Sequence, residues 1–405
     1  MAQRLPINSQ TRSSRDVKFS AIKENLLTQI GNNDDQAIFT HFLQSTTKTR
    51  KSYFVLPPEL ALNELTKSKI QWDIPFPPTV EPKFTFIDLF AGIGGMRAAF
   101  QSIGGKCVFS SEWDQKAQVT YFENFGEVPF GDITKVDTST VPDHDVLVAG
   151  FPCQAFSIAG ARAGFEDTRG TLFFDVARLI ADKQPKAFLL ENVKGLANHD
   201  RGRTLTTILN VLRNDLGYHV PDPKILNAKH FGVPQNRERI FIVGFKNEIS
   251  CDSFKYPTSE KVTKSVSDIL ETDEVSVKYY MSTQYLRTLI EHRRRHEEKG
   301  NGFGFEIIPN DGIANAIVVG GMGRERNLVI DKRLTNFKPI TKIKGSVNRR
   351  GIRRMTPREW ARLQGFPDKF TIPVSDAQAY KQFGNSVAVP VVRAIGENLL
   401  KVLER

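Results

Sequence analysis

Short apolar runs alternate with helical patterns between about residue 83 and residue 245, and this alternation constrains the fold more than any other feature of the chain. Buried strands are predicted at 84–90, 106–111, 146–150, 187–191 and 240–245. Helices are predicted between them at 96–103, 115–125, 172–183 and 204–216. Such alternation favours an α/β fold with an open, doubly wound and mostly parallel sheet that carries helices on both faces. Ligands of such sheets bind at the carboxyl ends of the strands.

The flanking sequence divides the chain into four segments. Residues 1–82 end in the proline-rich sequence IPFPP and predict an appended extension, which could serve as a regulatory DNA-binding arm, a dimer contact or a packing brace. Residues 83–245 form the predicted core. The alternation stops over residues 246–352, which predict a smaller inserted module. Helical patterning returns over residues 353–405, with helices expected at 356–363 and 389–403, so this segment is expected to rejoin the core.

The composition describes a globular protein. The chain has 405 residues and 40% apolar content, enough to bury a sizeable core. No stretch approaches the run of about 20 apolar residues that a membrane span needs, and no export signal is visible, so no membrane partner is expected. The three cysteines, Cys107, Cys153 and Cys251, cannot form a disulfide framework and lack the spacing of metal ligands. We therefore expect a cytoplasmic protein without a metal.

The charge distribution suggests an anionic partner. The net charge is +11, and the stretch from Lys246 to Arg354 holds 21 lysine and arginine residues against 14 acidic ones, a surplus of seven. Binding to nucleic acid explains such a surplus, because neutralised phosphates contribute much of the affinity. A solvated basic surface is an equal alternative on charge alone. The run Arg293, Arg294 and Arg295 could likewise bind phosphate or form a solvated helix face.

A glycine-rich turn marks a candidate nucleotide site. The sequence DLFAGIGG (88–95) lies where a strand turns into a helix, so its backbone can approach a ligand closely. NAD, FAD and S-adenosylmethionine all bind at such turns. The next strand leads to Glu112, about 20 residues on, where related folds hold ribose hydroxyls, and Trp113 could stack on adenine. The alternative is a helix cap at Asp114 beside a core tryptophan.

A cysteine follows the strand at 146–150 and so lies at the carboxyl edge of the predicted sheet. A lone cysteine such as Cys153 is more often an inert buried thiol, because reactivity requires access and a lowered pKa. The strand at 187–191, however, delivers Glu191 to the same edge. The sequence GVPQNRER places Arg237 and Arg239 just before another strand.

Six sequence blocks now carry a specific resemblance. FAGIGG (90–95), PCQ (152–154), ENV (191–193) and QNRER (235–239), in this order and spacing, look like the signature blocks of the DNA cytosine-5 methyltransferase family of bacterial restriction-modification systems. RMTPRE (354–359) and QFGNSV (382–387) resemble the last two blocks of that family. The likeness covers residues 83–245 and 353–405.

The resemblance implies covalent catalysis. Cytosine C5 is too weak a nucleophile to take a methyl group unaided, so the Cys153 thiolate would first add to C6. Glu191 would neutralise the resulting charge at N3, which requires a partly protonated carboxyl. Arg239 would hold the base carbonyl and orient Glu191. Arg237 and Gln235 would position the target nucleotide and the loop around Cys153.

The resemblance also implies S-adenosylmethionine as the methyl donor, bound in a Rossmann-like methyltransferase fold. Its methionine end would lie against Asp88, Phe90, Gly92, Ile93 and Gly95, its ribose against Glu112, and its adenine against Trp113, Asp132 and Ile133. Gly150, Pro152, Leu172, Asn385 and Val387 would complete the pocket. Because a base cannot reach such a site inside a duplex, it would be flipped out, and residues 154–165 would close over it.

The implied partner is double-stranded DNA, read by residues 246–352 as a target-recognition domain. The methylation would protect host DNA from a cognate restriction endonuclease without a stable complex, and the protein is expected to be a monomer. The alternatives are a methyltransferase of the related transfer-RNA-modifying type, which has a smaller recognition region, and a solitary regulatory DNA methyltransferase. A nicotinamide oxidoreductase has no use for Cys153 with Glu191, and a protein that only binds DNA would lack one of them.

Overall fold

A six-stranded sheet forms the centre of the computed structural model, which describes residues 74–152, 172–259, 261–302, 304–320 and 323–404. Its strand order is β2-β1-β3-β4-β7-β5. The strands are β1 (Phe84–Leu89), β2 (Gly105–Ser111), β3 (Val146–Gly150), β4 (Ala187–Val193), β5 (Lys224–Asn227) and β7 (Glu238–Phe245). The pairs of β1 with β2, β1 with β3 and β3 with β4 are parallel, whereas β7 is antiparallel to both β4 and β5. The predicted, mostly parallel sheet is confirmed.

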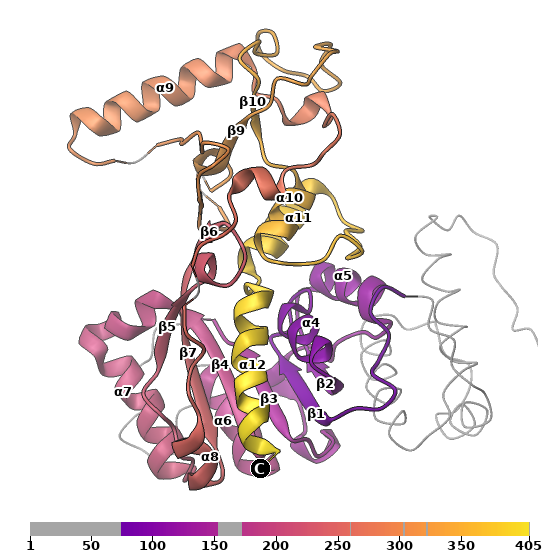
Figure 1. Cartoon of the computed structure of the whole chain (residues 1–405), viewed down its shortest axis with the longest axis vertical. Coiled ribbons are helices and arrows are strands. Elements are labelled where there is room, and N and C mark those ends of the chain that lie inside the picture. Colours follow the sequence, from indigo (N-terminus) through magenta and orange to yellow (C-terminus); the bar gives the residue numbers. More distant parts are fainter. Residues whose placement is uncertain (1–73, 153–171, 260, 303, 321–322, 405) are drawn as a thin grey trace, which may run out of the picture.

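Helices cover both faces of this sheet because its strands are apolar on both sides. On one face, Phe84 and Phe86 of β1 share a core with α4 (Gly95–Ser102), α5 (Gln115–Phe125) and α12 (Val389–Leu403). On the other face, Ile87 and Leu89 of the same strand pack with α6 (Leu172–Lys183) and α7 (Arg203–Asn210). Figure 1 shows α12 running alongside the strands.

Most core elements lie within a few residues of their predicted bounds, and the differences have local causes. The helix predicted at 204–216 is α7 followed by a π-helical turn, Val211–Asp215. The short edge strand β5 was not predicted, and its first two residues are exposed. Three helices were also missed, α8 (Glu248–Ser253), α9 (Thr283–Glu298) and α11 (Asp376–Asn385), whereas the predicted helix at 356–363 is present as α10 (Pro357–Leu363).

Residues 246–352, which we call the recognition segment for the role expected of them, build for the most part a smaller unit that Figure 1 shows at the far end of the molecule from the sheet. Strand β9 (Leu328–Ile330) pairs antiparallel with β10 (Ile352–Arg354), and α9 packs Leu286 and Leu289 against them. Strand β8 (Ala314–Asn315) pairs with β6 (Gln235–Asn236), which immediately precedes β7. The unit is therefore joined to the core by both pairing and chain connection.

The packed core extends beyond the predicted limits of 83 and 245. Upstream, Phe76 packs on Phe125 with 5.5 Å between ring centroids, and its amide donates to the Asn124 carbonyl at 3.0 Å. Downstream, α8 (Glu248–Ser253) lies against β7 and α12, and the Tyr256 hydroxyl donates to the Phe241 carbonyl at 3.0 Å. The proline-rich linker is thus docked on the core, and residues 246–256 belong to the core by their contacts. The remainder of the extension, residues 1–73, lies outside the described residues.

A buried arginine joins the recognition segment to the C-terminal segment. The Arg353 side chain is fully buried, and its Nε donates to Asp331 Oδ2 at 3.0 Å. Its two terminal nitrogens donate to the two carboxylate oxygens of Glu359, each at 2.8 Å. Glu359 also accepts the amide of Thr356 at 2.8 Å and so caps α10. One guanidinium therefore fixes the loop after β9 against the start of α10.

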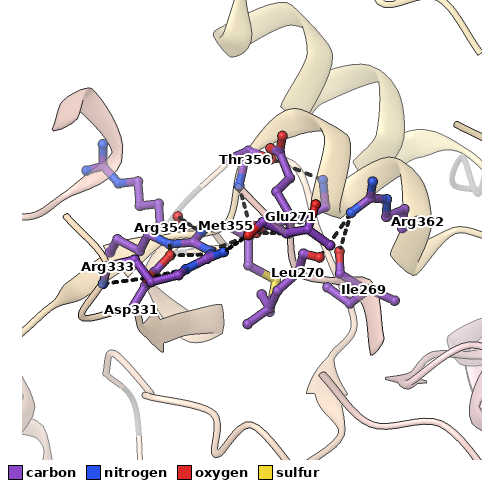
Figure 2. Close-up of polar contacts among 12 residues, drawn as sticks. Ile269, Leu270, Glu271, Asp331, Arg333, Arg354, Met355, Thr356 and Arg362 are labelled. Atoms are coloured by element: carbon purple, nitrogen blue, oxygen red, sulfur yellow. Dashed lines mark hydrogen bonds and ion pairs between the residues drawn. The ribbon is translucent and has the colours of Figure 1, made fainter. Parts of the chain in front are cut away.

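Neighbouring contacts extend this joint (Figure 2). Arg333 donates to the same Asp331, and the Thr356 hydroxyl donates to Glu271. Arg362 of α10 donates to the carbonyls of Ile269 and Leu270 at 3.2 and 3.1 Å. Two parts of residues 246–352, the chain at 269–271 and the loop after β9, are thus held at one place against α10.

We expect Arg353→Met to lower the free energy of unfolding by about 3–5 kcal/mol, because Asp331 and Glu359 would remain as buried carboxylates without their cation. Arg333→Met is the matched control, since it removes the more exposed partner of the same Asp331, and it should cost less than about 1 kcal/mol. Urea denaturation of both variants measures the difference. Equal losses would contradict the joint that we assign to Arg353.

Candidate active site

The carboxyl ends of β3 and β4 meet at one edge of the sheet, with Gly150 in register with Glu191. A Cβ atom at Gly150 would lie 3.6 Å from Glu191 Oε2. Phe151 and Pro152 continue from this edge, one buried and one exposed. Cys153 and the predicted loop at 154–165 lie outside the described residues. The chain therefore enters the segment of the predicted nucleophile directly beside the Glu191 carboxylate.

Asn192 holds this exit in place. Its side-chain Nδ2 donates to the Phe151 carbonyl at 2.9 Å, and both residues are buried. The sequence analysis quoted Asn192 as part of a block but gave it no role. Its position on β4 could have indicated this role. Successive side chains of a strand point to opposite faces, so the residue after Glu191 points away from it.

Arg239 and Glu191 form an ion pair. Because β7 is antiparallel to β4, its first residues return to the carboxyl edge, and Arg239 Nε lies 3.1 Å from Glu191 Oε1. Burial raises the pKa of Glu191, while the guanidinium groups of Arg239 and Arg237 oppose that shift without cancelling it. Burial also lowers the pKa of Arg239. Glu191 therefore holds a proton at higher pH than an ordinary glutamate.

Gln235 and Arg237 are buried and bind backbone atoms of distant segments. Gln235 accepts from the amide of Ile317 at 3.0 Å and donates to the carbonyl of Leu363 at 2.9 Å. Arg237 donates to the carbonyls of Ile317 at 2.7 Å and Gly384 at 3.1 Å. Burial, together with Arg239, lowers the pKa of Arg237 to about 9. These bonds join the core to the recognition segment and to the C-terminal segment. They show a structural role for both residues, and a contact of either residue with the target nucleotide stays a prediction.

The glycine-rich turn after β1 has an unusual backbone. Phe90, Gly92 and Gly94 have φ values of 56°, 56° and 83°. These values lie in the left-handed region, which residues other than glycine rarely adopt. A Cβ atom at Gly94 would lie 2.2 Å from the Phe125 ring. Glycine at 94 is therefore required both by the turn and by the approach of α5.

Glu112 joins this turn to the start of α5. Its two carboxylate oxygens accept the amides of Gly92 at 2.8 Å and Asp114 at 2.7 Å. Asp114 caps α5 by accepting the Lys116 amide, as the alternative interpretation expected. The same interpretation placed Trp113 in the core and is wrong there, because 79% of this side chain is exposed. An indole face thus lies open beside a carboxylate held at the strand end.

The remaining predicted cofactor residues gather around the same turn or at neighbouring strand ends. Asp88 is buried at the end of β1, and among the described residues its Oδ2 has no hydrogen-bond partner. Burial raises the pKa of Asp88 to about 7. Asp132 caps a 3-10 turn that begins at Ile133, which is buried. Leu172 is the first residue of α6.

The C-terminal segment reaches the glycine-rich turn as well. A Cβ atom at Gly95 would lie 2.9 Å from Val387 Cγ2, and Asn385 ends α11 two residues earlier. Ile93 is buried in the core that includes Val387. The arrangement offers a buried carboxylate with one unpartnered oxygen, an exposed indole and a glycine-rich backbone that a ligand can approach closely, which together fit a nucleoside that carries a charged tail. Among the described residues, no three His, Cys, Asp or Glu side chains gather as a metal site, and no helix could cross a membrane.

The family profile described as C-5 cytosine-specific DNA methylase matches residues 84–401. The chain belongs to this family. Its match begins at β1 and ends within α12, so it includes the sheet, the recognition segment and the C-terminal segment.

Named relatives are type II methyltransferases. The chain is 68% identical over 328 residues to Type II methyltransferase M.HpaII of Haemophilus parainfluenzae, covering 80% of this chain and 92% of that protein. It is 48% identical over 320 residues to M.DsaV of Dactylococcopsis salina, covering 79% and 86% of the two chains. These identities favour the DNA methyltransferase interpretation over the oxidoreductase and the transfer-RNA-modifying alternatives.

Solved structures agree on the fold. The Entamoeba histolytica methyltransferase EhMeth superposes with a TM-score of 0.60 at 19% identity, covering 79% of this chain and 99% of that chain. The S. pombe Dnmt2 methyltransferase gives 0.58 at 20% identity, covering 80% and 99%. At these identities the likeness establishes a methyltransferase fold and nothing finer.

Gly94→Ala should lower the free energy of unfolding by about 3 kcal/mol, since a left-handed non-glycine residue costs about 1–2 kcal/mol and the clash with Phe125 adds overpacking of similar size. Gly92→Ala is the matched control, because its φ is also positive but its nearest neighbour, the Phe90 carbonyl oxygen, is 3.9 Å away. It should show the backbone cost alone. Chemical denaturation of both variants tests this, and equal losses would refute the close approach of α5.

Proposed function

We propose that this DNA methyltransferase acts on cytosine C5 within a short, specific sequence of double-stranded DNA, with Cys153 as nucleophile, Glu191 as acid and S-adenosylmethionine as methyl donor. The observation that carries the proposal is the register of β3 against β4, which brings the chain leading to Cys153 beside Glu191. Family membership supplies the reaction class.

Cys153 supplies the electrons that cytosine C5 lacks. Its thiolate forms a bond to C6, and the electron pair of the C5–C6 double bond becomes available at C5. C5 would then take the methyl group from the sulfonium of the donor, which leaves as an uncharged thioether. Loss of the C5 proton to solvent water restores the double bond, the C6–sulfur bond breaks, and the thiolate is free again. The exit of β3, held by Asn192, would direct Cys153 toward the same edge as Glu191.

Glu191 neutralises the charge that this addition puts into the ring. A proton moves from its carboxyl to N3 as the C6–sulfur bond forms, and it returns when that bond breaks. The raised pKa of Glu191 supports this role, because the protonated form then persists to higher pH than that of an ordinary glutamate. Arg239, which is paired with Glu191, would orient the carboxyl and donate to the base carbonyl. Arg237 and Gln235 would act indirectly, by holding the recognition segment next to this edge.

The pocket around the glycine-rich turn would hold the methyl donor, whose sulfonium supplies an electrophilic methyl group. Glu112 retains free lone pairs for ribose hydroxyls after its two backbone bonds. Trp113 has an open face for adenine. Asp88, at the buried end of β1, is assigned to the charged methionine end. The other proposed contacts are Phe90, Gly92, Ile93, Gly95, Asp132, Ile133, Gly150, Pro152, Leu172, Asn385 and Val387.

The proposed substrate determines the partners. Because a stacked base cannot reach the edge of the sheet, the target cytosine is flipped out of the duplex. The recognition segment at 246–352 reads the sequence, and the type II relatives support a role in protecting DNA from a cognate restriction endonuclease. Because the proposed substrate is host DNA, we propose that the protein acts in the bacterial cytoplasm. We also propose that it acts as a monomer without a metal.

Cys153→Ser should abolish methylation and preserve DNA binding, because a hydroxyl of similar size is a far poorer nucleophile at neutral pH. Methyl transfer to duplex DNA and a filter-binding assay measure the two properties. With duplexes that contain 5-fluorocytosine, the wild type should form a denaturant-stable adduct, since fluorine cannot leave as a proton does. Mass spectrometry that located the adduct on another residue would remove Cys153 from the proposal.

Glu191→Gln should lower kcat by about 100-fold, the scale expected for loss of a positioned acid. In the wild type, the active form of Glu191 is protonated, so kcat should be full below the raised pKa and fall as pH rises through it. The variant should lack that basic limb, because an amide does not titrate. The pH profile of kcat, with the affinity for S-adenosylmethionine as control, measures both. A large loss of donor affinity instead would make Glu191 a structural residue.

A further inference from the structure

The positive surplus of the recognition segment comes from one loop. Residues 332–350, which we call the basic loop, contain seven lysine and arginine residues and no acidic residue. The rest of the stretch from Lys246 to Arg354 holds 14 basic and 14 acidic residues and is therefore neutral. The basic loop thus accounts for the whole surplus of seven.

Two of the three arginines in the other basic run, on α9, are paired with acidic residues of the same helix. Arg293 pairs with Glu297 at 2.7 Å and Arg294 with Glu298 at 3.6 Å, each one helical turn apart. The Arg295 Nε donates to the carbonyl of Glu291 at 3.4 Å. This run is the solvated, ion-paired helix face that the sequence left open as an alternative.

The basic loop is firmly held at its base. It connects β9 to β10, whose pairing closes it. Near its end, the side chain of Asn348 donates to the carbonyls of Met281 and Ile352 and accepts the amides of Arg350 and Ile352. Leu334 and Val347 are buried in a small apolar cluster. The loop therefore has a fixed position from which its longer side chains extend.

Those side chains are exposed. Arg333 pairs with Asp331, but within the described part of the chain the other six basic residues make no ion pair with a carboxylate. Arg349 lies over the Phe337 ring, 3.8 Å from its centroid. The other five are Lys332, Lys338, Lys342, Lys344 and Arg350. Gathering like charges on one loop without counter-charges is unfavourable in the free protein, and a polyanion would relieve that repulsion.

We propose that the basic loop is a phosphate-binding arm that supplies affinity for duplex DNA independently of sequence, separate from the residues that read bases. This inference rests on the proposed function, because it takes duplex DNA as the substrate. Lysine provides a flexible point charge suited to a phosphate but poorly suited to the bidentate readout of a base edge. The basic loop is therefore suited to increase the affinity for DNA, whereas α9 is not.

The test compares two variants that lose the same charge. The loop variant carries Lys338→Gln, Lys342→Gln and Lys344→Gln, and the α9 variant carries Arg293→Gln, Arg294→Gln and Arg295→Gln. Equilibrium binding of the full chain to two 20-base-pair duplexes is measured from 0.05 to 0.3 M salt. One duplex contains the site that the wild type methylates and the other lacks it.

The loop variant should lower the salt slope of log K by about two to three, since each lost phosphate contact removes about 0.9, and should weaken binding to both duplexes by about 100-fold or more at 0.1 M salt. Its methylation site should not change. The α9 variant should retain the wild-type slope. A variant with Lys338→Arg, Lys342→Arg and Lys344→Arg should also retain it, which separates charge from packing.

Equal slopes for the loop variant and the wild type would overturn the proposal, and so would an equal loss in the loop and α9 variants, because net charge alone would then explain it. A wild type that neither binds nor methylates the duplex would instead refute the proposed function itself.

Discussion

The structure depends on the parallel register of β3 and β4. Parallel strands need a crossover connection, and here it includes α6, so Gly150 and Glu191 become neighbours although 41 residues separate them. The same register lets Asn192 reach the Phe151 carbonyl. The antiparallel β7 then completes the edge, because a strand that runs opposite to β4 must begin where β4 ends. Arg239, near the start of β7, lies beside Glu191 for this reason.

The sequence predicted those parts of the fold that carry strong apolar patterns. Buried strands such as β1 and β4, and the helices between them, match closely because both faces of the sheet are covered. Strand β5 and helix α9 escaped prediction because one is a partly exposed edge strand and the other buries few residues, Leu286 and Leu289 among them. The partners of Arg237 could not be foreseen either, since they are backbone carbonyls 80 and 147 residues away.

Buried charge is used here to fix geometry between segments. Arg237 links the core to the recognition segment and the C-terminal segment, Arg353 links the last two to each other, and both have fixed acceptors at short distances. A buried ion pair adds little net stability compared with well-packed apolar residues, but its directional bonds allow few alternative arrangements. We interpret these arginines as residues that set the orientation of the recognition segment, on which the approach of the target base to Glu191 depends.

The carboxyl groups of the site explain how an acidic edge can admit a polyanion. Burial raises the pKa of Asp88, Glu112 and Glu191, so each keeps its proton to higher pH than an exposed carboxyl would. An ionised carboxylate near the DNA backbone would repel it most strongly in the low-dielectric interior, where screening by salt is weak. Approach of a phosphate would raise these pKa values further, because a nearby negative charge disfavours ionisation. Binding of DNA and retention of the Glu191 proton therefore favour each other, and the basic loop supplies its positive charge outside this edge, where it does not promote ionisation of the acid.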